Sequence, residues 1–204
     1  MTGLRIYVEG GGQSSAGKSQ IRRGFGEFMQ ELREAARGKR LSWTVVAAGS
    51  RDSAFNDFLT ATDLYPDEFV ILLVDSEGLV AGNLLAHLAH RDNWIIPASK
   101  ADNVHAMVQT QESWIVCDTA ALQKYYGAGF RASSLPVHPD IEQVDRRDVA
   151  RSLDRATERS KKGTYHKINH GGDVLTVISP ALVRARSAHC ERLFVTLKKM
   201  IDAV

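Results

Sequence analysis

The chain has few of the features that assign a protein to a special class. Its 204 residues include only two cysteines, Cys117 and Cys190, both within apolar stretches. This predicts buried free thiols in a reducing compartment rather than a disulfide framework. No apolar run reaches the length of a membrane span, and no signal peptide precedes the first strand pattern. We therefore expect a cytoplasmic protein without membrane association.

A strong charge of one sign is also missing, as are repeats and low-complexity tracts. The formal net charge is +2, which is too small to indicate nucleic-acid binding by itself. Hydrophobic residues make up 44% and charged residues 25%, which is ordinary for a globular protein. The length is enough for one α/β domain. We expect a single domain over residues 1–204, with a core in about 1–127 and a helical C-terminal portion over about 144–204.

The first third of the chain alternates between strand and helix patterns. Apolar strands are predicted over 4–8, 43–48 and 69–74, because sheets covered on both faces favour continuous apolar runs. Helices are predicted over about 19–37 and from Asp52 or Ser53 onward. This β-α-β-α-β order predicts a mostly parallel sheet flanked by helices, with right-handed crossovers.

The rest of the chain is predicted to be mainly helical. A fourth strand is expected over 114–117, and a polar loop is expected between Gly163 and the Gly171–Gly172 pair. Helices are predicted from Asp118 or Thr119 onward, over about 146–161, and from Ser179-Pro180 onward. A last helix is predicted to carry an apolar stripe of Cys190, Leu193, Phe194, Leu197 and Ile201.

Carboxylates follow two of the predicted strands. Glu9 ends the first strand, and Asp75 and Glu77 follow the third. Because the carboxyl ends of parallel strands meet at one edge of a sheet, these three side chains are expected to lie together. Such a cluster suits Mg²⁺ or Mn²⁺ and metal-dependent phosphoryl transfer. The alternative is that they are ordinary polar residues at strand ends.

The same stretch of chain contains a second motif. Gly12 to Ser19 reads G-x-x-x-x-G-K-S, the P-loop pattern, in which Lys18 would contact the terminal phosphates and Ser19 a magnesium ion. Two features count against nucleotide binding. Glu9-Gly10-Gly11 separates the strand from the motif, and a carboxylate there would repel nucleotide phosphates. The carboxylate site is favoured, and the P-loop stays as an alternative.

Basic residues gather late in the chain. Arg147, Arg151 and Arg155 are spaced by four and share one helical face, which would suit contact with a phosphate backbone. Acidic residues are interleaved with them, so a solvated, salt-bridged surface is the competing interpretation. Lys167 and His166 lie in the predicted polar loop. They are candidate catalytic residues, because a lysine can stabilise negative charge that develops on a phosphoryl group.

Several separated motifs together resemble a known family. They are Arg5-Ile6-Tyr7-Val8-Glu9-Gly10-Gly11-Gly12, Gly49-Ser50-Arg51-Asp52, Leu73-Val74-Asp75-Ser76-Glu77, Arg91-Asp92-x-Trp94, Glu112-x-Trp114 and Tyr165-His166-Lys167. The chain resembles the domain-of-unknown-function family numbered 4276, which is regarded as similar to the Toprim domains of topoisomerases, primases and overcoming-lysogenization-defect nucleases.

This resemblance implies roles for the acidic residues. Glu9 would match the Toprim glutamate, a general acid/base or metal ligand, and Asp75 and Glu77 would match the paired aspartates that bind magnesium. Glu77 departs from the usual aspartate. Glu112 is a further candidate ligand, because it precedes the predicted strand at Trp114. The implied function is a nuclease acting on DNA or RNA with an ATPase partner, in anti-phage defence. A regulatory subunit with a degenerate site is the non-enzymatic alternative.

Overall fold

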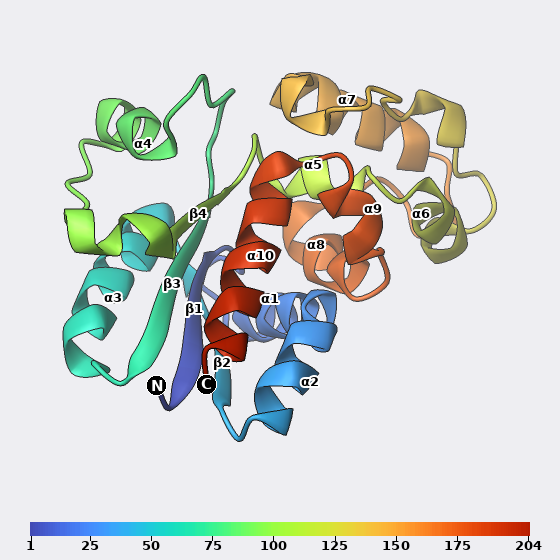
Figure 1. The fold of residues 1–204 in the computed structure, drawn as a ribbon. Coiled ribbons are helices and arrows are strands. Elements are labelled where there is room, and N and C mark those ends of the chain that lie inside the picture. Colours follow the sequence, from blue (N-terminus) through green and yellow to red (C-terminus); the bar gives the residue numbers. More distant parts are fainter.

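The computed structural model describes residues 1–204 and has one parallel sheet at its centre (Figure 1). The strand order is β2-β1-β3-β4, and every neighbouring pair is parallel. The strands are β1 (Gly3–Glu9), β2 (Ser42–Gly49), β3 (Glu68–Asp75) and β4 (Val104–Met107). The predicted α/β class with a helical C-terminal portion is confirmed.

Ten α-helices surround the sheet and form most of the second half of the chain. They are α1 (Ser15–Phe28), α2 (Gln30–Gly38), α3 (Arg51–Leu64), α4 (Leu84–Asp92), α5 (Gln111–Ile115), α6 (Thr119–Tyr126), α7 (Arg146–Thr157), α8 (Lys167–Leu175), α9 (Pro180–Arg184) and α10 (Ala188–Asp202). None of them is both long and apolar enough to cross a membrane. Three short 3₁₀ helices occupy 98–103, 132–134 and 141–143.

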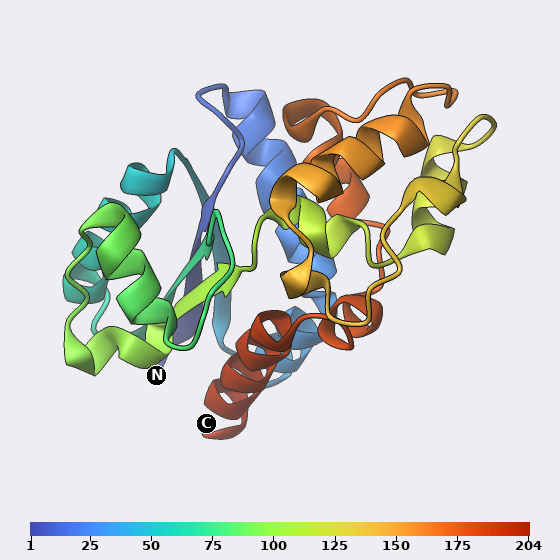
Figure 2. The same cartoon turned by 90° about the horizontal axis from the view of Figure 1, so that it is seen from above.

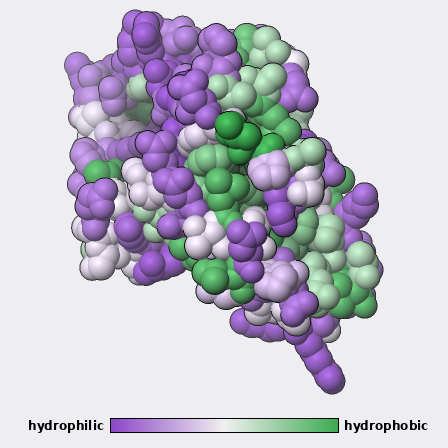
Figure 3. Space-filling model, turned by 90° about the vertical axis from the view of Figure 1, so that its left-hand side faces the viewer, coloured by the Kyte–Doolittle hydropathy of each residue, from purple (hydrophilic) through white to green (hydrophobic).

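Side chains alternate along each strand, so the central strands contribute to an apolar cluster on each face of the sheet. Leu4, Ile6 and Val8 of β1 point into the larger of two apolar clusters, which also takes in α1, α2 and most of the C-terminal helices. The smaller cluster lies on the opposite face, where Leu72 packs with α3 and α4. A band of hydrophobic side chains also reaches the surface on the α3 and α4 side (Figure 3). The sheet is therefore held between two helical layers.

The last helix belongs to the larger cluster. Its predicted apolar stripe is buried along the whole length of α10, which confirms that this face is core. Cys117 and Cys190 are both free and buried, as predicted. Burial raises the pKa of the Cys117 thiol to about 12, so this thiol stays protonated and unreactive at neutral pH.

Several predicted boundaries were wrong. The fourth strand is β4, whereas 114–117 belongs to α5 and the turn after it. Trp114 and Ile115 are completely buried between the sheet and the C-terminal helices, and a short apolar run fits a fully buried helix as well as a strand. The predicted helix over 19–37 is interrupted at Met29, which separates α1 from α2. The third helix is capped by Ser50 rather than by Asp52 or Ser53.

The predicted polar loop before Gly171 and Gly172 is largely helix α8, which packs closely against α1. A Cβ atom at Gly24 of α1 would lie 2.5 Å from the carbonyl oxygen of Gly172. A Cβ atom at Gly172 would lie 2.6 Å from the carbonyl oxygen of Gln20. The glycines therefore mark a close approach of two helix backbones rather than a flexible loop.

Candidate metal centre

Three carboxylates meet where β1 and β3 end. The two strands pair in parallel up to Val8 and Leu73, which brings Glu9 and Asp75 to the same edge of the sheet. One oxygen each from Glu9, Asp75 and Glu77 lies within 4.8 Å of the other two. Beyond Glu9 the chain turns away through glycines with positive φ, and the N–H of Gly10 donates to the carbonyl of Gly49 at 3.0 Å. The predicted convergence of the three side chains is present.

Asp75 is the most deeply placed of the three, with 1% of the residue exposed. Its Oδ1 accepts a hydrogen bond from the N–H of Gln111 at 2.7 Å, and its Oδ2 accepts one from Lys167 Nζ at 2.8 Å. Burial raises the pKa of Asp75 to about 6, with further increases from Glu112 and Glu9, although Lys167 acts in the opposite direction. The carboxyl group therefore takes up a proton more readily than an ordinary aspartate.

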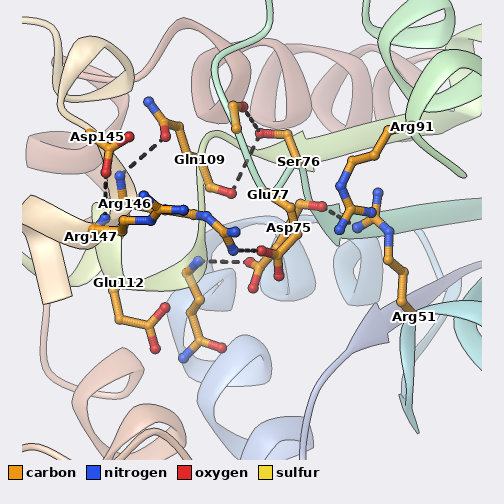
Figure 4. A network of polar contacts seen from close by, with 12 residues as sticks. Arg51, Asp75, Ser76, Glu77, Arg91, Gln109, Glu112, Asp145, Arg146 and Arg147 are labelled. Carbon is orange, nitrogen blue, oxygen red and sulfur yellow. Dashed lines mark hydrogen bonds and ion pairs between the residues drawn. The ribbon is translucent and has the colours of Figure 1, made fainter.

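Glu77 is held in an uncommon backbone conformation. Its φ of 60° lies in the left-handed region, which few residues other than glycine adopt. Its N–H donates to the carbonyl of Gln109 at 2.8 Å, and the Ser76 hydroxyl donates to the carbonyl of Gly78 at 2.6 Å. These bonds fix the turn that points the Glu77 carboxylate toward Asp75 (Figure 4). Strain of this kind is typical of functional sites.

Glu9 and Glu77 are each bound by an arginine that was not predicted as a site residue. The Arg51 guanidinium donates to Glu9 Oε2 at 3.3 Å, and also to the main-chain carbonyl of Asp75. It forms a two-pronged ion pair with Asp92, at 3.0 and 2.6 Å. Arg146 pairs with Glu77 through Oε2. The only signals for these residues were the Gly49-Ser50-Arg51-Asp52 motif and the late basic segment.

Lys167 joins the cluster, although it is the first residue of α8 and not a loop residue. Besides Asp75, its ammonium lies 3.6 Å from Glu112 Oε2. Burial lowers the pKa of Lys167, but Asp75 and Glu112 raise it by more, so the ammonium stays charged. Its position next to Asp75 places a fixed positive charge at the site.

Two other candidates lie beside the three carboxylates rather than among them. Glu112 belongs to α5 and not to a strand entrance, and its Oε1 accepts a hydrogen bond from the Tyr165 hydroxyl at 2.9 Å. His166 is the exposed N-cap residue of α8, and its ring contacts the N–H of Asn169. No contact joins His166 to Glu9, Asp75 or Glu77.

The P-loop motif lies mostly within the first turns of α1. The N–H of Gly17 bonds to the Ser14 hydroxyl at 3.0 Å, and the N–H of Lys18 bonds to the Ser14 carbonyl at 3.1 Å. Both donors are thus occupied by the helix cap. Ser19 is exposed. The Lys18 side chain lies against Gly49, because a Cβ atom placed on this glycine would be 3.5 Å from the Lys18 ammonium. A phosphate-wrapping loop needs those N–H groups free.

Comparison with known proteins places the chain in a family. The family model described as a domain of unknown function (DUF4276) matches residues 8–198, and the chain belongs to that family. No curated protein and no solved structure matches the chain. The similarity to Toprim domains stays a prediction from the sequence motifs.

Proposed function

We propose that this member of the family is a Mg²⁺- or Mn²⁺-dependent phosphoryl-transfer enzyme that cleaves phosphodiester bonds of DNA or RNA. The observation that carries the proposal is the convergence of Glu9, Asp75 and Glu77 within 4.8 Å at the carboxyl edge of a parallel sheet. Ligand sites of open α/β sheets lie at this edge. A fixed lysine and a strained glutamate at the same point favour chemistry over an ordinary polar loop.

The three side chains suit a hard divalent cation. Glu9 and Glu77 each bind an arginine through Oε2, and Oε1 of each accepts no hydrogen bond from the protein. Two carboxylate oxygens without donors, beside the Asp75 carboxylate, are the ligands that Mg²⁺ and Mn²⁺ prefer. A bound cation would supply an activated water molecule and would stabilise charge on the phosphoryl oxygens.

The neighbouring residues would orient the ligands and the substrate. Arg51 fixes Glu9 relative to the end of β3, because one guanidinium nitrogen bonds to both. The N–H of Gln111 and the ammonium of Lys167 fix Asp75. Lys167 is 45% exposed in its side chain, so its ammonium can also attract a substrate phosphate and neutralise charge that builds on it.

The alternatives are supported less well. Nucleotide binding at Gly12–Ser19 would require N–H groups of Gly17 and Lys18 that already cap α1. A regulatory subunit with a degenerate site would not need Arg51, Arg146 and Lys167 to hold the three carboxylates in position. The proposed ATPase partner and the role in anti-phage defence rest on the Toprim resemblance alone.

The test compares metal binding and cleavage among carboxylate variants. Calorimetry would measure Mg²⁺ and Mn²⁺ affinity for wild type, Glu9→Gln, Asp75→Asn and Glu77→Gln, and labelled DNA and RNA would measure cleavage. The matched control is Asp63→Asn, an exposed carboxylate at the end of α3 away from the site. We expect each of the three site variants to lose metal affinity and cleavage, and the control to keep both.

A further variant separates the nucleotide-binding alternative. Lys18→Ala should leave metal affinity and cleavage intact. If wild type binds ATP and Lys18→Ala abolishes that binding while the carboxylate variants keep it, the P-loop would be the functional site. Absence of metal affinity and of cleavage on every nucleic acid tested would contradict the proposal and favour the regulatory subunit.

A further inference from the structure

Helix α7 connects the acidic site to a surface with basic character. It lies to one side of the sheet, at the level of the carboxyl ends of the strands and beside α5 (Figures 1 and 2). Its first residue, Arg146, pairs with Glu77. Val149, Leu153 and Ala156 bury the opposite side of the helix in the larger apolar cluster. The helix is therefore fixed in place, with its N-terminal end at the three carboxylates.

A small hollow of about 250 Å³ lies between α7 and the site. Its walls combine both signs of charge, from Glu77 and Glu112 and from Arg146, Arg147 and Lys167. Ala150, one turn further along α7, also lines it, and its small side chain leaves room beside the arginines. A hollow that places cationic groups next to carboxylates suits a phosphate group that approaches a metal ion.

The basic stripe, defined as Arg147, Arg151 and Arg155, leads away from this hollow. All three residues are exposed, and four-residue spacing carries them along about 12 Å of the helix surface. Arg151 pairs with Asp148, a surface contact of the kind that contributes little energy. The guanidinium groups of Arg147 and Arg155 form no ion pair, although acidic residues are interleaved in the sequence.

We infer that the basic stripe binds the phosphate backbone of a nucleic-acid strand and directs it to the carboxylate site. The inference rests on the proposed function and adds the route of the substrate. Each arginine is free, or held only by a weak surface pair, so each can take a phosphate without breaking a buried contact. The hollow at the N-terminal end of α7 then receives the scissile phosphate. Arg146 leaves its ion pair with Glu77 and binds that phosphate instead.

The test measures binding without cleavage. Fluorescence anisotropy in EDTA would follow a labelled oligonucleotide, as single-stranded DNA, duplex DNA and RNA, over a series of salt concentrations. The stripe variant carries Arg147→Gln, Arg151→Gln and Arg155→Gln. Its matched control carries Arg37→Gln, Lys39→Gln and Lys199→Gln, which remove the same charge at the opposite end of the molecule, where α2 and the end of α10 lie (Figure 1).

We expect the stripe variant to bind at least about tenfold more weakly, and its salt dependence to fall by about two to three in the slope of log K against log salt. The control should match wild type. Equal weakening of both variants would show an effect of net charge alone and would overturn the inference, as would unchanged binding by the stripe variant or no binding by wild type. The form of nucleic acid that the stripe variant binds more weakly than wild type does is the form that the stripe binds.

A second measurement separates this inference from the proposed function. Metal-dependent hydrolysis of the small diester bis(p-nitrophenyl) phosphate reports on the carboxylate site without needing the stripe. If wild type and the stripe variant hydrolyse it equally while oligonucleotide binding is unchanged, the stripe inference fails and the proposed function stands. If neither wild type nor variant hydrolyses any diester, but the stripe variant alone loses binding, the proposed function fails and the stripe remains a nucleic-acid surface.

Discussion

The protonation of Asp75 should make both stability and metal binding depend on pH. In the metal-free protein burial raises the pKa of Asp75 from 3.8 to about 6. A shift of about two units corresponds to a free-energy difference of about 3 kcal/mol between the two protonation states. Because the folded state binds this proton more tightly than the unfolded state, protonation of Asp75 contributes to the free energy of unfolding. The contribution is fully present below about pH 4 and is lost as the pH rises through about 6.

The variant Asp75→Asn isolates this effect, because it lacks the titrating group. In EDTA, the free energy of unfolding of wild type relative to Asp75→Asn should fall by up to about 3 kcal/mol between about pH 4 and pH 7. For a protein of this size that difference corresponds to about 6–12 °C in melting temperature. Urea unfolding followed by circular dichroism, across this pH range, measures it for both proteins.

Addition of excess Mg²⁺ should reverse the loss in wild type alone. A cation binds the ionised carboxylate, so its affinity should fall about tenfold for each pH unit below about 6. Stabilisation by Mg²⁺ should thus be large at pH 7 to 8 and small near pH 5. A wild-type stability that runs parallel to that of Asp75→Asn at every pH, or Mg²⁺ stabilisation that is equal at pH 5 and pH 8, would refute the reasoning.

Four other substitutions test the surroundings of the site and the helix packing. Lys167→Met should tighten Mg²⁺ binding about tenfold, because it removes a competing cation, yet slow cleavage at least about 100-fold; calorimetry and cleavage rates measure the two effects. Arg51→Met should lower the free energy of unfolding in urea by about 1.5–3 kcal/mol, because it removes hydrogen bonds to the partly buried carboxylates of Glu9 and Asp92. Gly24→Ala should cost about 2–3 kcal/mol by urea unfolding, since its Cβ would collide with the Gly172 carbonyl, whereas Gly26→Ala on the same helix meets only a flexible arginine and should be neutral or gain about 0.5–1 kcal/mol.

Strand β4 shows why part of the fold escaped prediction. It has only four residues, too few to show a periodicity, and one of them is His105. That histidine is buried with neither ring nitrogen bonded, and burial lowers its pKa to about 3. A histidine within so short a segment interrupts the apolar pattern that would indicate a buried strand. The apolar run at Trp114 was the stronger strand signal, but the structure buries it as a helix.

The glycines show a related limit. Gly171 and Gly172 are predicted to border a polar loop, because glycine is common in turns. In the structure they lie inside α8, where the missing side chains let its backbone approach α1. A single sequence does not distinguish these two uses of glycine, because the partner helix lies about 150 residues away along the chain.

The parallel sheet and the meeting point of Glu9, Asp75 and Glu77 could be predicted from the order of strands and helices in the sequence. Apolar strands that alternate with helices favour parallel pairing, and residues that end such strands share one edge. The cations that bind these carboxylates could not be predicted in this way and are seen only in the folded protein. Lys167 is 92 residues from Asp75, and Arg146 is 69 residues from Glu77. These contacts arise because α8 packs against α1 and α7 packs against α5, and no local pattern in the sequence encodes a pairing over such distances.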